Sequence, residues 1–167
     1  MKKIGLILFL SAFGFAGAQQ TAEEIIGTAA EQAKIENKNV LVFFHASWCG
    51  WCRRMEENME NEMVKDYFDN NFEKAFLTVQ ETPKNKNLET PVGEEVLDRL
   101  GGNRHGLPYW VILSPDGKIL ADSKVNGQNL GCPADEKEVA AMISKFKDFS
   151  PNLELKPDLI REVFVMK

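Results

Sequence analysis

The chain has 167 residues, of which 44% are hydrophobic and 27% are charged, a composition typical of one folded domain and unlike that of a disordered or collagen-like chain. Its net charge of −5 gives no global electrostatic reason to bind nucleic acid or an anionic membrane. The three cysteines are too few for a disulfide-rich scaffold, and their odd number cannot pair off completely.

The first eighteen residues follow the plan of a secretory signal peptide. Lys2 and Lys3 precede an apolar run over residues 4–16, and Ala16-Gly17-Ala18 forms an A-x-A cleavage site. The run is too short to span a bilayer comfortably, which disfavours the alternative of an uncleaved anchor. We expect residues 19–167 to remain as one exported domain without stable membrane insertion, in the periplasm or outside the cell, where cysteine pairs form and persist.

The mature chain begins with a predicted helix and a buried strand. Apolar residues recur at helical spacing across residues 21–37. Residues 40–44 form a continuous apolar run, which predicts a central strand covered on both faces. A helix is expected after it, with apolar residues every three or four positions and its methionines in the core: Cys52, Met55, Met59, Met63 and Tyr67.

The sequence of the middle of the chain predicts a second strand, then a loop and then a capped helix. Residues 72–80 are β-prone, whereas residues 81–89 are polar and contain a proline, which is typical of a loop. Thr90-Pro91 predicts a helix start, with threonine as the N-cap and proline in the first turn. Gly101-Gly102 would end this helix. Its expected buried face consists of Val92, Val96, Leu97 and Leu100.

A hairpin and a last clear helix complete the predicted domain. Residues 109–113 and 118–122 are predicted strands, joined by the turn signal Ser114-Pro115-Asp116-Gly117. Asp135 is expected to form a capping box with Glu138 before a helix with an apolar face. From about residue 150 an extension follows, whose apolar end should pack back on the domain. The order of elements predicts an α/β fold with a central mixed β-sheet and helices on both faces. The apolar positions of the last helix and the extension are Val139, Met142, Ile143, Phe146, Val163, Phe164 and Val165.

The motif Cys49-Gly50-Trp51-Cys52 is the strongest chemical signal in the chain. It lies between a predicted strand and a predicted helix, so the first sulfur would sit where unpaired N–H groups and the helix dipole favour an anion. A lowered thiol pKa makes a better nucleophile. The second sulfur lies about one turn further on, close enough to form a disulfide. Such a pair suits thiol–disulfide exchange, in which one cysteine attacks and the other resolves.

Three alternative roles fit the cysteine pair less well than redox chemistry. A zinc site needs four ligands, and the chain offers only one further cysteine and two histidines at unhelpful spacings. A c-type haem site needs a histidine after the second cysteine, where Arg53 stands. An inert disulfide across one helical turn would constrain almost nothing. The redox interpretation is therefore favoured.

Residues 40–52 resemble the active-site strand and motif of the thioredoxin superfamily, with Trp48 at the family's tryptophan before the first cysteine. Gly106-Leu107-Pro108-Tyr109 is similar to the family's second signature, in which a proline with a cis peptide bond faces the CxxC pair. The Ser-Pro-Asp-Gly hairpin also fits. The resemblance covers residues 21–147, looks closest to exported bacterial proteins of the CGWC type, and implies a thioredoxin-like fold.

The resemblance also implies roles for individual residues. Cys49 would attack and Cys52 would resolve. Backbone groups at Leu107 and Pro108 would bind an extended substrate segment by strand-like hydrogen bonds. Trp48 and Trp51 would flank the sulfurs as an apolar contact surface.

The chain departs from the family pattern at several positions. CGWC replaces the CGPC of thioredoxin, so the redox potential does not transfer. Phe43 stands where thioredoxin has a buried aspartate, so the usual proton acceptor for the resolving thiol is missing. His45 is either an accessory catalytic group or, more often in such a position, a packing residue with satisfied nitrogens. His105, just before the Pro108 segment, could line the site, but a solvated loop histidine is favoured. Cys132 is expected to be a half-buried free thiol, the alternatives being an intermolecular bridge or a regulatory thiol.

These features predict an exported thiol–disulfide oxidoreductase that exchanges disulfides with envelope proteins. Its redox group would be the Cys49–Cys52 pair, with no metal or nucleotide cofactor, and a membrane electron donor or acceptor would be a further partner. The direction of electron flow stays open. The main alternative is a non-catalytic polypeptide-binding module. A peroxide-reducing thiol enzyme is disfavoured because Arg53 and Arg54 are expected to lie on the surface of their own helix.

Overall fold

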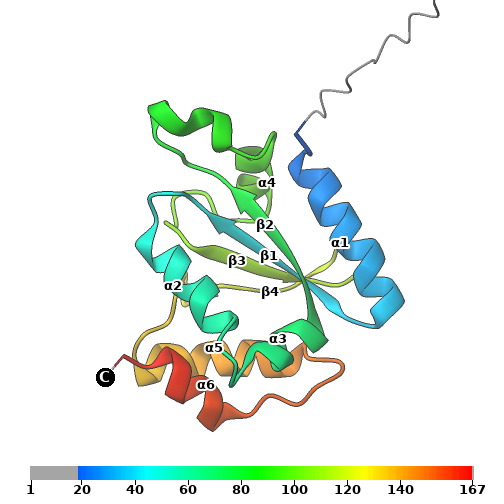
Figure 1. The fold of residues 1–167 in the computed structure, drawn as a ribbon, viewed down its shortest axis with the longest axis vertical. Helices are drawn as coiled ribbons and strands as arrows, with labels where there is room; N and C mark the ends of the chain where they lie inside the picture. Colours follow the sequence, from blue (N-terminus) through cyan, green and yellow to red (C-terminus); the bar gives the residue numbers. More distant parts are fainter. Residues whose placement is uncertain (1–18, 167) are drawn as a thin grey trace, which may run out of the picture.

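The computed structural model describes residues 19–166 (Figure 1). The predicted signal peptide, residues 1–18, lies outside the described residues. The helices are α1 (Ala22–Glu36), α2 (Gly50–Met59), α3 (Lys65–Asn71), the 3₁₀ helix η1 (Pro83–Leu88), α4 (Gly93–Arg99), α5 (Glu136–Asp148) and α6 (Pro157–Phe164). The strands are β1 (Asn39–His45), β2 (Phe72–Thr78), β3 (Tyr109–Leu113), β4 (Ile119–Asp122), β5 (Lys124–Val125) and β6 (Gln128–Asn129).

A four-stranded sheet in the order β2-β1-β3-β4 forms the centre of the domain. β1 runs parallel to β2 and antiparallel to β3, and β3 is antiparallel to β4. The predicted mixed sheet is therefore confirmed. Residues 40–44 are almost completely buried, as expected for a central strand with neighbours on both edges and helices on both faces.

The two faces of the sheet carry separate halves of the core. Because successive side chains of a strand point to opposite faces, Leu41 and Phe43 join one apolar cluster and Val40, Val42 and Phe44 join the other. The first cluster includes side chains from α2, α3, α5 and α6, and the second includes side chains from α1 and α4. In Figure 1, α1 lies on one side of the sheet and α2, α5 and α6 lie on the other.

Side chains cap the first turns of α1 and α5. Thr21 accepts from the Glu24 N–H and Glu24 reaches back to the Thr21 N–H, a complete capping box before α1. Asp135 accepts the N–H groups of Lys137 and Glu138 at the start of α5. The Glu138 carboxylate, however, accepts from Ala134 rather than from Asp135, so the capping box predicted there is only half formed.

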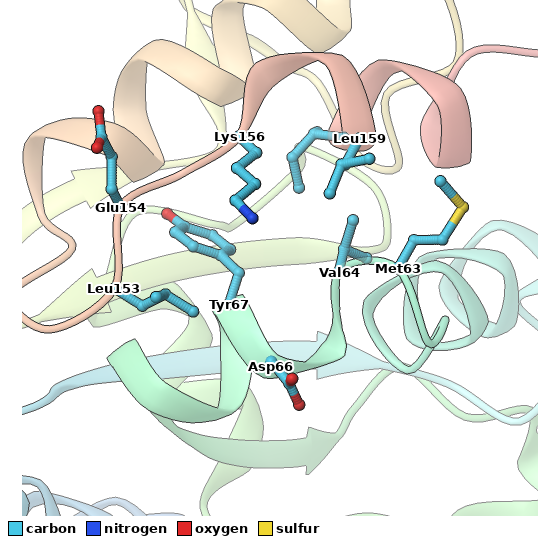
Figure 2. A pocket seen from close by; sticks show the side chains of 9 residues that line it. Met63, Val64, Asp66, Tyr67, Leu153, Glu154, Lys156 and Leu159 are labelled. Carbon is cyan, nitrogen blue, oxygen red and sulfur yellow. The ribbon is translucent and has the colours of Figure 1, made fainter.

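The helix predicted from Cys52 to Tyr67 is wrong as a single element. α2 ends at Met59, and a turn in which the Val64 N–H donates to the Asn61 carbonyl, 2.9 Å away, precedes α3. This turn breaks the helical repeat, so Met55 and Met59 lie in the core as predicted whereas Met63 is 42% exposed. Met63 instead lines a hollow of about 270 Å³ between α3 and the C-terminal segment, together with Leu153 and Leu159 (Figure 2).

The predicted helix start at Thr90-Pro91 is also wrong. The Thr90 hydroxyl accepts the N–H of Thr78 at the end of β2, 3.0 Å away, and is not the cap of a helix. α4 begins at Gly93 after Val92, which has a left-handed φ of 54° and is 41% exposed instead of buried. Val96 and Leu97 are buried, and Gly101 ends the helix region with a φ of +80°. The preceding polar segment, predicted as a loop, contains η1.

The C-terminal extension packs back on the domain, as predicted. Phe164 of α6 is fully buried, and Phe68 and Phe146 lie around it in the larger cluster. An asparagine pair anchors the segment that leads to α6: the Asn71 side chain accepts the N–H groups of Asn152 and Leu153, 2.9 and 3.1 Å away. None of the described helices combines the length and the apolar character needed to cross a membrane.

Candidate active site

A disulfide joins Cys49 and Cys52 at the start of α2. Cys49 is the N-cap residue and Cys52 lies in the first turn, with Cα atoms 5.3 Å apart and an S–S distance of 1.95 Å. The backbone N–H of Cys52 donates to the Cys49 sulfur, 3.1 Å away. When the bond is reduced, this N–H and the positive end of the helix dipole favour a thiolate at Cys49. The cysteine pair therefore lies between a strand and a helix start and is close enough to form a disulfide, as the sequence predicts.

The turn before Cys49 is held by residues that follow β2. The Trp48 indole N–H donates to the Gln80 carbonyl at 2.8 Å. The Glu81 carboxylate accepts both the backbone N–H and the hydroxyl of Ser47, and only 4% of Glu81 is exposed. The Ser47 backbone N–H holds the pKa of this carboxyl below its ordinary value. Arg53 donates to the Ser47 carbonyl at 2.9 Å from the other side.

Leu107 and Pro108 form the second part of the site. The peptide bond between them is cis, as the resemblance implies, and Pro108 is buried. A groove of about 280 Å³ brings the segment from His105 to Pro108 together with Trp51, which is 50% exposed. Trp48 is also half exposed but is not among the residues that line this groove. The structure thus joins Trp51, Leu107 and Pro108 in one surface and leaves Trp48 against the Gln80 backbone.

His45 has partners for both ring nitrogens. Nδ1 lies 2.8 Å from a carboxylate oxygen of Glu56 on α2, and Nε2 lies 3.2 Å from the Thr78 hydroxyl on β2. The side chain is three-quarters buried and connects three elements, which matches the packing residue expected from the sequence. Phe43 is fully buried with its ring edge-on to Phe76, so an aromatic contact occupies the position of the family's aspartate.

The structure also shows the surroundings of His105, Arg54 and Cys132, the other residues considered in the sequence. The His105 ring stacks on Tyr109 with centroids 6.2 Å apart, so it is partly buried rather than a freely solvated loop residue. Arg54 lies over the Trp51 ring, 5.9 Å from its centroid. Cys132 lines the groove but is only 6% exposed, which is more buried than predicted. Burial raises the pKa of the Cys132 thiol to about 11, which makes it a poor nucleophile at neutral pH.

The β5–β6 hairpin and two polar residues beside the site were not predicted from the sequence. The hairpin turns at Asn126-Gly127, with φ values of 51° and 79°. An Asn-Gly pair between short strands is a known two-residue turn signal, so the hairpin could have been found. It carries Asn129, whose side chain contacts the segment that leads to Pro108. No local pattern singles out Asn129 or Glu81, because each acts on a distant part of the chain.

The described residues place no group of three or more His, Cys, Asp or Glu side chains where it could hold a metal ion. The redox group that the structure contains is the cysteine pair itself.

Comparisons with known proteins agree with this arrangement. A family described as thioredoxin-like matches residues 21–115. No curated protein sequence matches the chain. The structure is similar to that of a disulphide isomerase from Xylella fastidiosa Temecula1, with a TM-score of 0.51, 19% identity and 96% of each chain covered. This likeness concerns the fold.

Two structural matches have lower TM-scores. An oxidoreductase named DsbH has a TM-score of 0.48 and 20% identity, with 86% of this chain and 93% of that chain covered. The C-terminal domain of DsbD from Neisseria meningitidis has a TM-score of 0.45 and 21% identity, with 63% of this chain and 84% of that chain covered. The family match spans more than half of the chain and contains the cysteine pair, and the mixed sheet carries that pair at a helix start. The chain therefore belongs to the thioredoxin-like family, with the fold and CxxC pair of a thiol–disulfide oxidoreductase.

Proposed function

We propose that this protein is an exported thiol–disulfide oxidoreductase that exchanges disulfides with proteins of the cell envelope. One observation carries the proposal: the Cys49–Cys52 disulfide caps α2 in a thioredoxin-like domain, close to a groove lined by Trp51 and Pro108. The groove supports a polypeptide rather than a small molecule as substrate, because it is an open, shallow surface rather than an enclosed cavity.

Each half of the exchange replaces one S–S bond by another. In the reduced protein, the Cys49 thiolate attacks a substrate disulfide, forms a mixed disulfide and releases one substrate sulfur as a thiolate, which takes up a proton. Cys52 then loses its proton and attacks the Cys49 sulfur. The Cys49–Cys52 bond forms and the second substrate thiol leaves. The substrate disulfide gains two electrons and two protons, and the protein dithiol loses them; the reverse sequence oxidises a substrate dithiol.

The groove residues have separate roles in this proposal. Trp51 supplies apolar contact area beside the sulfurs, and Trp48 supplies it on the side of Gln80. The backbone at Leu107 and Pro108 pairs with an extended substrate segment around its cysteine. His45 has a supporting role between β1, α2 and β2, since both of its nitrogens are engaged.

We further propose that residues 1–18 direct export and are removed after Ala18. The described domain is compatible with this cut, because α1 and its capping box begin only at Thr21. Intact-mass measurement of the protein isolated from the envelope fraction tests the proposal: the expected N-terminus is Gln19. Recovery of full-length chain from the cytoplasm would contradict it.

Turnover distinguishes the enzyme from a non-catalytic polypeptide-binding module. We expect the protein to catalyse reduction of insulin by dithiothreitol, Cys49→Ser to abolish this activity, and Cys132→Ser, the matched control, to retain it. Insulin reduction that survives in Cys49→Ser would favour the binding module. The reduction potential of the Cys49–Cys52 pair, compared with its redox state in cells, gives the direction: a strongly reducing pair found reduced indicates a reductase, and an oxidising pair found as disulfide indicates an oxidase or isomerase.

A further inference from the structure

The two N–H groups of the Asn129 side chain face three carbonyls of the segment that contains the cis peptide bond, so one N–H is shared between two of them. The amide nitrogen lies 3.0 Å from the His105 oxygen, 3.1 Å from the Gly106 oxygen and 2.9 Å from the Pro108 oxygen. Asn129 belongs to β6, on the small hairpin that is separate from the main sheet. One side chain therefore holds the carbonyls on both sides of Leu107.

The opposite end of the Asn129 amide fixes its orientation. Oδ1 accepts the backbone N–H of Gly131 at 3.0 Å and the Ser123 hydroxyl at 2.6 Å. A backbone N–H can only donate and a carbonyl can only accept, so the oxygen must face Gly131 and the nitrogen must face the segment 105–108. Ser123 is fully buried and also receives the Trp110 N–H, 3.3 Å away, which ties the amide to β3.

Leu107 is the residue of this segment whose backbone takes no part in the hydrogen bonds of Asn129. Its backbone N–H and C=O have no hydrogen-bond partner within residues 19–166, although the carbonyls of Gly106 and Pro108 are engaged by Asn129. Leu107 also lines the groove beside Trp51. A donor and an acceptor on the backbone of one residue in the groove are what an added strand needs for pairing.

We propose that Asn129 is the positioning residue of the substrate-binding edge. It holds the neighbouring carbonyls inward and so presents Leu107 as the one residue of this segment free to pair with a substrate backbone. This inference rests on the proposed function, since it assumes that protein substrates bind at Leu107 and Pro108. It assigns Asn129 no part in the sulfur chemistry.

The test separates protein binding from sulfur chemistry. Asn129→Asp keeps the size of the side chain but sets an oxygen against three carbonyls, and Asn129→Ala removes the contacts. We expect the KM for insulin reduction to rise about tenfold or more in both, the equivalent of losing one to two hydrogen bonds. The rate at which the reduced protein attacks the small disulfide 5,5′-dithiobis(2-nitrobenzoate), and the reduction potential, should stay within about twofold of the wild type, because neither needs strand pairing. Gln128→Ala, at the exposed neighbouring position, is the matched control and should leave all three unchanged.

The outcomes are distinguishable. An unchanged KM in both Asn129 variants overturns the inference, and so does an equal loss of the protein and small-disulfide reactions, which indicates a merely structural role. A wild type that reacts with neither substrate instead refutes the proposed function. Ser123→Ala, which removes one bond to Oδ1, should show the same split at smaller size and provides the test if the Asn129 variants do not fold. Its failure to raise the KM would equally count against the inference.

Discussion

Two methionines that share one sequence pattern should differ sharply in their contribution to stability. Met55 lies in α2, one turn after Cys52, and is fully buried, whereas Met63 follows the break in the helix and is 42% exposed. Complete burial of a methionine side chain is worth about 1.5–3 kcal/mol, and truncation of a buried one adds a cavity, for a total of about 2–5 kcal/mol. Met63→Ala loses about half of the transfer free energy and leaves no enclosed cavity, so it should cost about 0.8–1.5 kcal/mol.

The assay is urea unfolding of Met55→Ala and Met63→Ala in the oxidised state, with thermal unfolding alongside. At about 2–4 °C of Tm per kcal/mol for a domain of this size, Met55→Ala should lower the Tm by about 4–20 °C and Met63→Ala by about 2–6 °C. Equal losses in the two variants would refute the reasoning, because they would mean that the helical repeat continues through residues 60–64 and buries both side chains.

Three further predictions follow from other parts of the structure. The lowered pKa of Glu81 means that its contribution to stability is present above its ordinary pKa of about 4.5 and is lost as the pH falls through the lower folded-state value, so Glu81→Gln should flatten the fall in Tm below about pH 4.5. The Cys132 thiol of the oxidised protein should react with 5,5′-dithiobis(2-nitrobenzoate) only after unfolding, because burial raises its pKa to about 11; rapid stoichiometric reaction of the native protein would contradict this. Gly102→Ala should cost about 1–3 kcal/mol in urea unfolding because its new Cβ would lie 2.6 Å from the Tyr109 ring, whereas Gly27→Ala, at an open position in α1, should stabilise by about 0.5–1 kcal/mol.

Sequence reasoning succeeded where the controlling interactions are local. Three correct predictions depend on the spacing of hydrophobic residues and on caps within a few residues. They are the helix α1, the buried strand over residues 40–44 and the position of Cys49 at a helix start. The resemblance added the cis bond before Pro108, which no local pattern reveals. The mixed sheet and the position of the cysteine pair at the start of the following helix could thus be predicted.

The errors occur where a distant partner decides the conformation. Thr90 has the composition of an N-cap, but the end of β2 takes its hydroxyl. Met63 fits the helical repeat, but the turn at Asn61 removes it from that face. Asn129 has no signal of its own, because its three carbonyl partners lie more than twenty positions away in the chain. A single sequence contains the donor and the acceptors but does not show that they lie next to one another in the fold.

The hydrogen bonds between the Asn71 side chain and the segment at Asn152 have a practical consequence for the design of shorter fragments of this protein. The family match ends at residue 115, yet α5 and α6 supply Phe146, Phe164 and much of the cluster that contains the cysteine pair. A fragment that stopped with the match would keep both redox cysteines but would expose the rings of Phe68, Phe72 and Trp110, which pack against Phe146. Large exposed apolar patches promote aggregation. We therefore expect the folding unit to extend through Phe164, and a transfer of the CxxC region to another protein to require α5 and α6 as well.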